Sequence, residues 1–269
     1  MLYIFVFLIF IIVLIFLLRE STLKKEFQRD LRFYWGEQNK VWEEKELPEL
    51  LKRYLEYTGL VNEKDKSIVH ISYQDVSFSQ SKKGPVLKME YEQYNFVNPL
   101  RRLAYMKSSM FGIPFEGYDT YHVGKSSMRG VIGKYFPLFD QKEKALEEGN
   151  LVTILAESLF LPNLLFSENI HFEKLNEHQI KGELKVEDIR VSGIFTFNEK
   201  NEYVSFYTDT RAQVDNGGNI RYAPWQAICE DYQKNPQGYC LPSKFKAIWK
   251  EEEDFVYFDG LITSIEYKK

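Results

Sequence analysis

The sequence is poor in the residues that most often carry crosslinks, metals or nucleophilic chemistry. It has 2 cysteines and 4 histidines among 269 residues. The histidines lack the i, i+4 or short-loop spacing that is usual for metal sites. They are His70, His122, His171 and His178. Because the sequence also has no glycine-rich phosphate loop, nucleophile elbow or dinucleotide fingerprint, we expect neither a metal site nor a cofactor.

Concentrated positive charge is also missing. The formal net charge is −4, and no basic block occurs beyond the residues that directly follow the N-terminal apolar run. Proteins that bind nucleic acids need a concentrated basic footprint, so a nucleic-acid partner is excluded. The chain also lacks internal repeats and Pro/Gly/Ser-rich linkers, which favours a single large domain over residues 46–269.

One long apolar run opens the chain. Leu2 to Leu18 contains no charged residue and no proline. As a helix with a rise of ~1.5 Å per residue it would extend about 25 Å, the lower end of what crosses a hydrocarbon core. A cleaved signal peptide would need a basic start and a small-residue cleavage site, whereas this chain continues directly into Arg19-Glu20. We therefore predict a transmembrane anchor in residues 1–20 that contacts the bilayer through residues 2–18.

Two helices are predicted after the anchor. Apolar side chains recur at i, i+4, i+8 and i+11, which predicts that the anchor continues as an amphipathic stalk to about Trp35, within residues 21–45. These side chains are Leu23, Phe27, Leu31 and Tyr34. Pro48 suits the start of a second, core-facing helix, and Gly59 suits the residue after its end.

Two features of the sequence disagree about the side of the membrane on which the domain lies. Basic residues follow the anchor rather than precede it, and the positive-inside rule then leaves the domain in the cytoplasm. Cys229 and Cys240, however, flank a predicted turn, and such a pair in an envelope protein suits a disulfide. Two unpaired thiols are the alternative. We favour an extracytoplasmic domain and keep the cytoplasmic alternative open.

From Ser67 onward the apolar residues recur with the period of two that is typical of strands. Val69, Ile71 and Tyr73 alternate with polar residues, and Val76 then shifts the alternation by one, which predicts a β-bulge. About twelve strands joined by short turns are predicted, and short turns imply antiparallel neighbours. One of these strands spans Met128 to Phe136.

A helix interrupts the strands. Residues 151–160 are apolar almost all round, so this helix is expected to be buried against the sheet. A sheet of this size twists and curls rather than staying flat. We therefore predict an α+β fold in which a large curved antiparallel sheet, shaped like a half-barrel, packs on helices.

A series of short motifs in residues 46–267 resembles an uncharacterised bacterial family of unknown function, whose members often carry N-terminal membrane segments. The motifs are Leu47-Pro48-Glu49-Leu50-Leu51-Lys52-Arg53-Tyr54-Leu55, Gly112, Gly117-Tyr118-Asp119-Thr120-Tyr121, Leu155-Ala156-Glu157 with Pro162, Pro224-Trp225, Gly238 with Leu241-Pro242 and Trp249, and Tyr257-Phe258 with Ile262 and Ile265-Glu266-Tyr267. Phe160 departs from the pattern, in which a Trp is common. The resemblance implies no activity. The predicted architecture is also similar to the half-barrel of lipoprotein-carrier proteins, which hold acyl chains in an apolar concavity.

Glu157 is the most unusual polar residue, because it lies in an otherwise apolar helix. An isolated buried carboxylate is costly, so it should pair with a cation such as Arg190 or Arg211, face solvent, or have a raised pKa and a functional role. A hydrolase of glycosidase type would need Glu157 and Asp119 to converge. A triad of Asp119 with His122 and a nearby serine is disfavoured, since the first two point to opposite faces of one strand.

A set of aromatic and methionine side chains is the candidate ligand-binding surface, because such side chains suit adaptable apolar sites. Its members are Trp225, Trp249, Met106, Met110, Phe111 and Tyr121. Ordinary sheet core is the competing interpretation. The leading functional hypothesis is a membrane-anchored protein of the bacterial cell envelope that binds an apolar ligand, namely a lipid or a lipoprotein acyl chain. The alternatives are an envelope structural or interaction module without a cavity, and an unrecognised hydrolase.

Overall fold

The computed structural model describes residues 3–5, 7, 19–36, 45–110, 112–214 and 218–269. Most of the predicted anchor, residues 2–18, lies outside this part of the chain. No helix in the described part is both long enough and apolar enough to cross a membrane.

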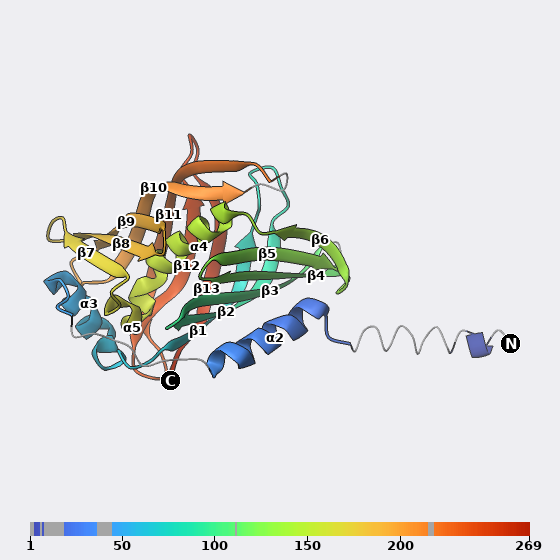
Figure 1. Cartoon of the computed structure of the whole chain (residues 1–269), viewed down its shortest axis with the longest axis horizontal. Helices are drawn as coiled ribbons and strands as arrows, with labels where there is room; N and C mark the ends of the chain where they lie inside the picture. The colour runs from blue at the N-terminus through green and yellow to red at the C-terminus, as the bar shows by residue number, and fades with distance from the viewer. Residues whose placement is uncertain (1–2, 6, 8–18, 37–44, 111, 215–217) are drawn as a thin grey trace.

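The described residues form one antiparallel sheet of 13 strands in the order β6-β5-β4-β3-β2-β1-β13-β12-β11-β10-β9-β8-β7, and the sheet curls into a half-barrel (Figure 1). The strands are β1 (Ile68–Phe78), β2 (Leu87–Val97), β3 (Leu100–Met110), β4 (Ile113–His122), β5 (Lys125–Ile132), β6 (Phe136–Gln141), β7 (Ile170–Lys174), β8 (Gln179–Val186), β9 (Ile189–Phe197), β10 (Tyr203–Val214), β11 (Ile220–Lys234), β12 (Cys240–Trp249) and β13 (Phe255–Lys268). The predicted curved antiparallel α+β fold is thus confirmed.

Two meanders build this sheet, and the pairing of β1 with β13 joins them. Every pair of strands that is consecutive in sequence is adjacent in the sheet except β6 and β7, which form its two edges. The chain must therefore cross from one edge to the other between these strands. It does so through α4 (Lys144–Glu157), the 3-10 turn η2 (Ser158–Phe160) and α5 (Pro162–Leu165). This crossing places α4 over the concave face, where it packs on β5, β9 and β10.

Two details of the strand prediction differ in outcome. The β-bulge is confirmed, because the pairing of β1 with β2 shifts between Tyr73 and Val76, and Asp75 has a φ of 51°. The single strand predicted from Met128 to Phe136 is wrong. Gly133 and Lys134 both adopt positive φ and turn the chain, so β5 ends before them and β6 begins after them.

The helix α3 (Glu49–Thr58) agrees with the prediction, since Pro48 caps its start and Gly59 follows its end with a φ of 80°. The turn η1 (Leu60–Asn62) comes next. The helix α4 begins at Lys144, seven residues before the predicted start at Leu151. The residues between Lys144 and Glu148 include good helix formers, and they continue the buried helix toward the edge of the sheet.

Helix α2 (Thr22–Trp35) lies within the predicted stalk, residues 21–45. It begins afresh at Ser21, whose hydroxyl accepts a hydrogen bond from the backbone N–H of Lys24, and it packs on β3 and β4. Leu23 and Phe27 are buried there against aromatic side chains of the sheet. Along β2, the aromatic residues that belong to this cluster alternate with residues that face α4. Helices α2 and α4 therefore cover opposite faces of the sheet.

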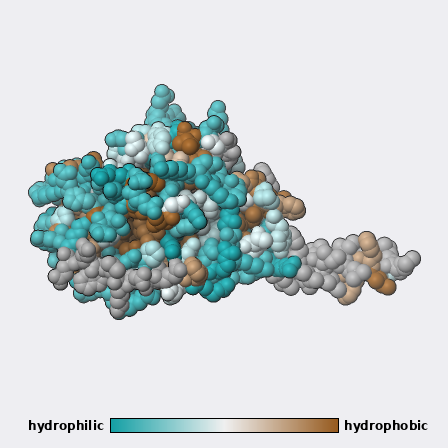
Figure 2. All heavy atoms as spheres, viewed as in Figure 1, coloured by the Kyte–Doolittle hydropathy of each residue, from teal (hydrophilic) through white to brown (hydrophobic). Residues whose placement is uncertain are grey.

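Most apolar side chains face inward. Figure 2 shows a mainly hydrophilic surface, with hydrophobic atoms visible chiefly along the middle, where α4 and α5 lie in Figure 1.

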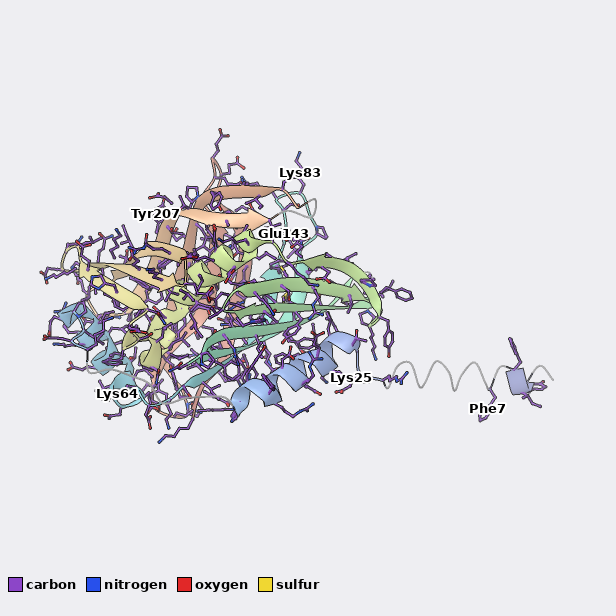
Figure 3. The ribbon with its side chains drawn as sticks, in the orientation of Figure 1. Phe7, Lys25, Lys64, Lys83, Glu143 and Tyr207 are labelled. Carbon is purple, nitrogen blue, oxygen red and sulfur yellow. The ribbon has the colours of Figure 1, made fainter. Side chains whose placement is uncertain are left out.

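In the upper part of the same view, Figure 3 labels Lys83, on the turn between β1 and β2, and Glu143, which precedes α4. Gln80 of that turn and Leu146 of α4 both line the cavity described next.

Candidate functional site

A cavity of about 200 Å³ lies between α4 and the concave face of the sheet. Its lining combines aromatic and methionine side chains with buried polar groups. The apolar lining includes Tyr73, Phe78, Met89, Met106, Met128, Trp225, Phe245, Trp249, Tyr257 and Phe258. The polar lining includes Gln93, Arg102, Asp119, Asn150, Thr153, Glu157 and Arg211. The sheet curvature and the crossing helix together create this space.

The structure brings together half of the predicted ligand-binding residues. Trp225, Trp249 and Met106 line the cavity. Tyr121 is fully buried in the core but does not line it. Phe111 and the side chain of Met110 lie outside the described part of the chain.

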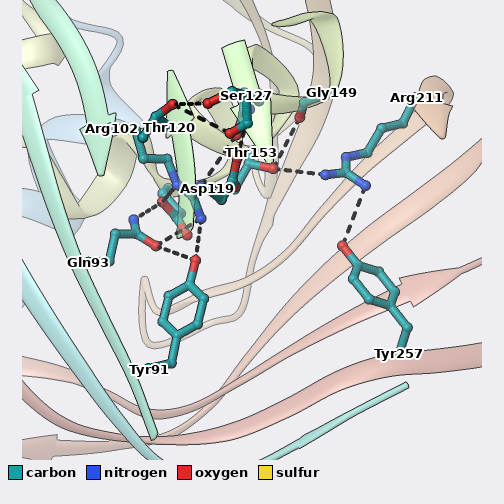
Figure 4. Close-up of polar contacts among 12 residues, drawn as sticks. Tyr91, Gln93, Arg102, Asp119, Thr120, Ser127, Gly149, Thr153, Arg211 and Tyr257 are labelled. Carbon is teal, nitrogen blue, oxygen red and sulfur yellow. Dashed lines mark hydrogen bonds and ion pairs between the residues drawn. The ribbon is translucent and has the colours of Figure 1, made fainter. Parts of the chain in front are cut away.

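Arg102 is the centre of the buried polar cluster, and its residue is only 4% exposed. Its Nη1 donates a 2.7 Å hydrogen bond to Asp119 (Figure 4). The same nitrogen donates a 3.3 Å bond to Asn150. Its Nη2 donates to the hydroxyl of Tyr91 at 2.5 Å and to the Gln93 side-chain oxygen at 3.0 Å. These partners saturate both terminal nitrogens of the guanidinium, and they fix it rigidly.

The sheet register explains why these side chains meet. Ala104 of β3 lies opposite Gln93 of β2 on one side and opposite Asp119 of β4 on the other. Arg102, two residues before Ala104, is therefore the diagonal neighbour of both on the same face. Sequence reasoning missed Arg102 because its partners Asp119 and Gln93 lie on the two neighbouring strands. The shared alternation of these three strands is the signal that would have placed them together.

Glu157 accepts a 2.6 Å hydrogen bond from the Gln93 amide, and its Oε2 lies 3.9 Å from Nε of Arg102. The predicted partners are therefore corrected. Arg190 pairs with Glu183 at 2.8 Å, while the alternative of an exposed Glu157 is excluded because the residue is 2% exposed. Burial raises the pKa of Glu157, and Arg102 and Gln93 oppose this rise. Glu157 and Asp119 do converge, but each interacts with Arg102.

Arg211 of β10 has a different environment. Its guanidinium carbon lies 4.8 Å from the ring centroid of Trp225 and 5.1 Å from that of Trp249. It donates to the hydroxyls of Thr153 at 3.1 Å and Tyr257 at 3.4 Å (Figure 4). Among the described residues, no carboxylate oxygen lies within 4.0 Å of this guanidinium.

The predicted disulfide is wrong, because both cysteines are free. Cys229 of β11 lies opposite Phe245, whereas Cys240 of β12 lies opposite Lys234. An offset of five residues corresponds to roughly 17 Å along a strand, whereas a disulfide needs Cα atoms roughly 4.4–6.8 Å apart.

The histidines and the triad candidates lie elsewhere. His122 and Ser126 line a separate polar pocket to which Asp119 does not contribute. His70 stacks on Tyr94 at a centroid distance of 4.1 Å. Among the described residues, no group of three or more His, Cys, Asp and Glu side chains is arranged to hold a metal ion.

Comparisons with known proteins bear on the fold and the family. No curated protein matches the chain. Among solved structures, it is similar to a putative outer membrane lipoprotein-sorting protein domain from Vibrio parahaemolyticus, with 7% identity, 81% of this chain and 91% of that chain covered, and a TM-score of 0.43. It is also similar to a DUF1329 family protein from Desulfovibrio piger, with 9% identity, coverage of 81% and 91%, and a TM-score of 0.36. A β-barrel-like DUF1849 protein from Brucella abortus shares 8% identity, with coverage of 76% and 99% and a TM-score of 0.26.

The family comparison covers most of the chain. Residues 41–260 match a family of unknown function, DUF6544. This range includes every residue of the cavity lining and ends within β13. The chain therefore belongs to the DUF6544 family of unknown function.

Proposed function

We propose that this protein binds a small amphipathic ligand, such as part of a lipid or a lipoprotein acyl chain, in the cavity between α4 and the concave sheet. The observation that carries the proposal is the cavity itself, about 200 Å³ of partly open space between α4 and the concave face of the sheet. Concave, mostly apolar surfaces with a few polar groups are where small molecules commonly bind. A structural module with a filled core is therefore the less favoured alternative.

The apolar wall suits a chain-like group. Met89, Met106 and Met128 line the cavity beside Trp225 and Trp249. Methionine side chains are flexible and adapt to ligands of irregular shape, and aromatic rings supply large contact areas. The volume is below the roughly 300–1,000 Å³ of pockets for drug-sized molecules, which favours a short chain or one inserted end of a longer chain. With the predicted anchor, such a ligand would come from the bilayer of the bacterial envelope.

The hydrolase alternative is less well supported. Asp119 and Glu157 line the cavity, but both interact with Arg102, and Glu157 is almost fully buried. A general acid or nucleophile must reach the substrate, and these carboxylates already have internal partners.

A cavity-filling variant tests the proposal. Ala247 lines the cavity, so Ala247→Leu should fill part of it. Val256 is 45% exposed on the neighbouring strand, so Val256→Leu is the matched control. Native mass spectrometry of the full chain, extracted gently from membranes, should show a co-purifying lipid-like mass in the wild type and the control, and a much smaller fraction in Ala247→Leu. A wild-type protein that stays free of ligand after incubation with membrane lipids would overturn the proposal.

A further inference from the structure

We propose that the ligand carries an anionic group, a carboxylate, sulfate or phosphate, and that Arg211 binds this group inside the cavity. The inference rests on the proposed function and specifies the chemical class of the ligand.

The first support is that no carboxylate in the described part of the chain forms an ion pair with Arg211. A buried or half-buried arginine is normally paired with a carboxylate or another anion. Arg211 lines the cavity, yet its hydrogen-bond partners Thr153 and Tyr257 are both neutral hydroxyls. Glu157 interacts with Arg211 at longer range, but this carboxylate is turned to Gln93 and Arg102. An anionic ligand group would supply the missing partner.

The second support is the hydrogen-bonding capacity that remains. A guanidinium has five N–H donors. Hydrogen bonds to described residues use Nη1 and Nη2 once each, so each of these two nitrogens keeps one further N–H. Arg102, by contrast, has four bonds on its two terminal nitrogens. Arg211 is thus the cavity arginine with donors to spare, and planar donors of this kind match carboxylate, sulfate and phosphate oxygens.

The third support is the backbone that directs Arg211 inward. The pairing of β10 with β11 shifts between Thr208 and Arg211. Without this irregularity, two residues three apart on a strand would point to opposite faces, but Thr208 is buried and Arg211 lines the cavity. Such bulges commonly redirect a side chain at functional sites. Gly149 of α4 also allows the helix to approach this part of β10, because a Cβ there would lie 3.1 Å from the backbone oxygen of Ala212, next to Arg211.

The two tryptophans complete the arrangement. The guanidinium of Arg211 lies over the ring faces of Trp225 and Trp249. This contact leaves the N–H edge of the guanidinium available for an anion. The hydroxyl of Tyr257, which accepts from Trp225 Nε1 at 3.1 Å, is fixed by the same cluster. The site is therefore arranged around a cavity-lining guanidinium whose terminal nitrogens keep hydrogen-bonding capacity.

The test compares three probes with the same tail: octyl sulfate, octanol and octyltrimethylammonium. Each is titrated calorimetrically into the full chain kept soluble in amphipol, with amphipol alone as the blank. A charge-assisted hydrogen bond should make octyl sulfate bind roughly tenfold or more tightly than octanol. The cationic probe should bind more weakly than either.

Variants assign the preference to Arg211. Arg211→Gln should bring octyl sulfate and octanol within about twofold of each other, because the charge-assisted bond is lost. Arg211→Lys should keep part of the preference, which also guards against a variant that fails to fold. Arg190→Gln is the matched control, since Arg190 is exposed and pairs with Glu183 outside the cavity. Its preference should equal that of the wild type.

Each outcome separates the two proposals. If none of the three probes binds the wild type, the proposed function is wrong. If octanol and octyl sulfate bind equally well, the cavity binds ligands but the anionic class is wrong. If the preference survives in Arg211→Gln, the anion is bound by another group and the inference is overturned.

Discussion

Glu157 of α4 and Arg102 of β3 meet inside the molecule, with 3.9 Å between Oε2 and Nε, and both side chains are at most 5% exposed. This contact links the crossing helix to the middle of the sheet. Because Arg102 also binds Asp119 of β4, a single guanidinium connects α4 with two adjacent strands. The cluster therefore fixes the position of the helix that covers the cavity.

Loss of the Glu157 carboxylate should destabilise the fold. Glu157→Ala leaves the Gln93 amide without its acceptor and removes one of the two carboxylates around Arg102. We expect the free energy of unfolding to fall by about 3–5 kcal/mol, the usual cost of breaking a buried ion pair. Glu183→Ala breaks the exposed pair with Arg190 and should cost less than about 1 kcal/mol. Urea denaturation of both variants measures the difference, and equal losses would contradict a structural role for Glu157.

The raised pKa of Glu157 should make stability depend on pH. A carboxyl whose pKa is higher in the folded state binds its proton more tightly there, so its contribution to stability is present at low pH and is lost as the pH rises. The loss begins near the ordinary glutamate pKa of about 4.3 and continues through the raised value of the folded state. Glu157→Gln removes this titration. The difference in unfolding free energy between variant and wild type should therefore shift in favour of the variant from pH 4 toward pH 7. A difference independent of pH would show that Glu157 does not titrate in this way.

Local patterns predicted the parts of the fold that depend on neighbours in the sequence. The helix after Pro48, the bulge after Tyr73 and most hairpins follow from residues within a few positions of each other. The strand β6 was missed because Gly133-Lys134 turns the chain inside an apolar run that alternates well enough to be one strand. The early start of α4 was missed because its first turns are polar and show no apolar stripe.

The candidate site depended on contacts that sequence spacing does not reveal. Glu157 was recognised as unusual, but its partner lies on a strand that becomes adjacent only when the chain crosses the whole sheet between β6 and β7. The aromatic residues Trp225 and Trp249 were predicted because their type suits a pocket. The inward direction of the Arg211 side chain depends on a bulge in β10 that the flanking residues do not predict.

The two cysteines should react at different rates. Cys229 is buried, and burial raises the pKa of its thiol, so the reactive thiolate is scarce. Cys240 is only partly buried and contacts the hydroxyl of Tyr57. A thiol-reactive reagent should label Cys240 in the native protein and Cys229 only after denaturation, as peptide mass mapping would show. A mass two hydrogens lower without reductant would instead reveal a disulfide, and would mean that the register between β11 and β12 is wrong.

Helix α2 offers a comparison between two phenylalanines on one element. Phe27 is 4% exposed and lies between Tyr105, at a centroid distance of 5.2 Å, and Tyr118, at 5.7 Å, whereas Phe33 is 60% exposed. Phe27→Ala removes a ring from this outer core, so it should lower the free energy of unfolding by about 3 kcal/mol. Phe33→Ala should change it by less than about 0.5 kcal/mol. Because the two substitutions are chemically identical, the contrast isolates burial from helix propensity. Similar small effects for both would mean that α2 stands away from the sheet as a stalk, and that the domain is stable without it.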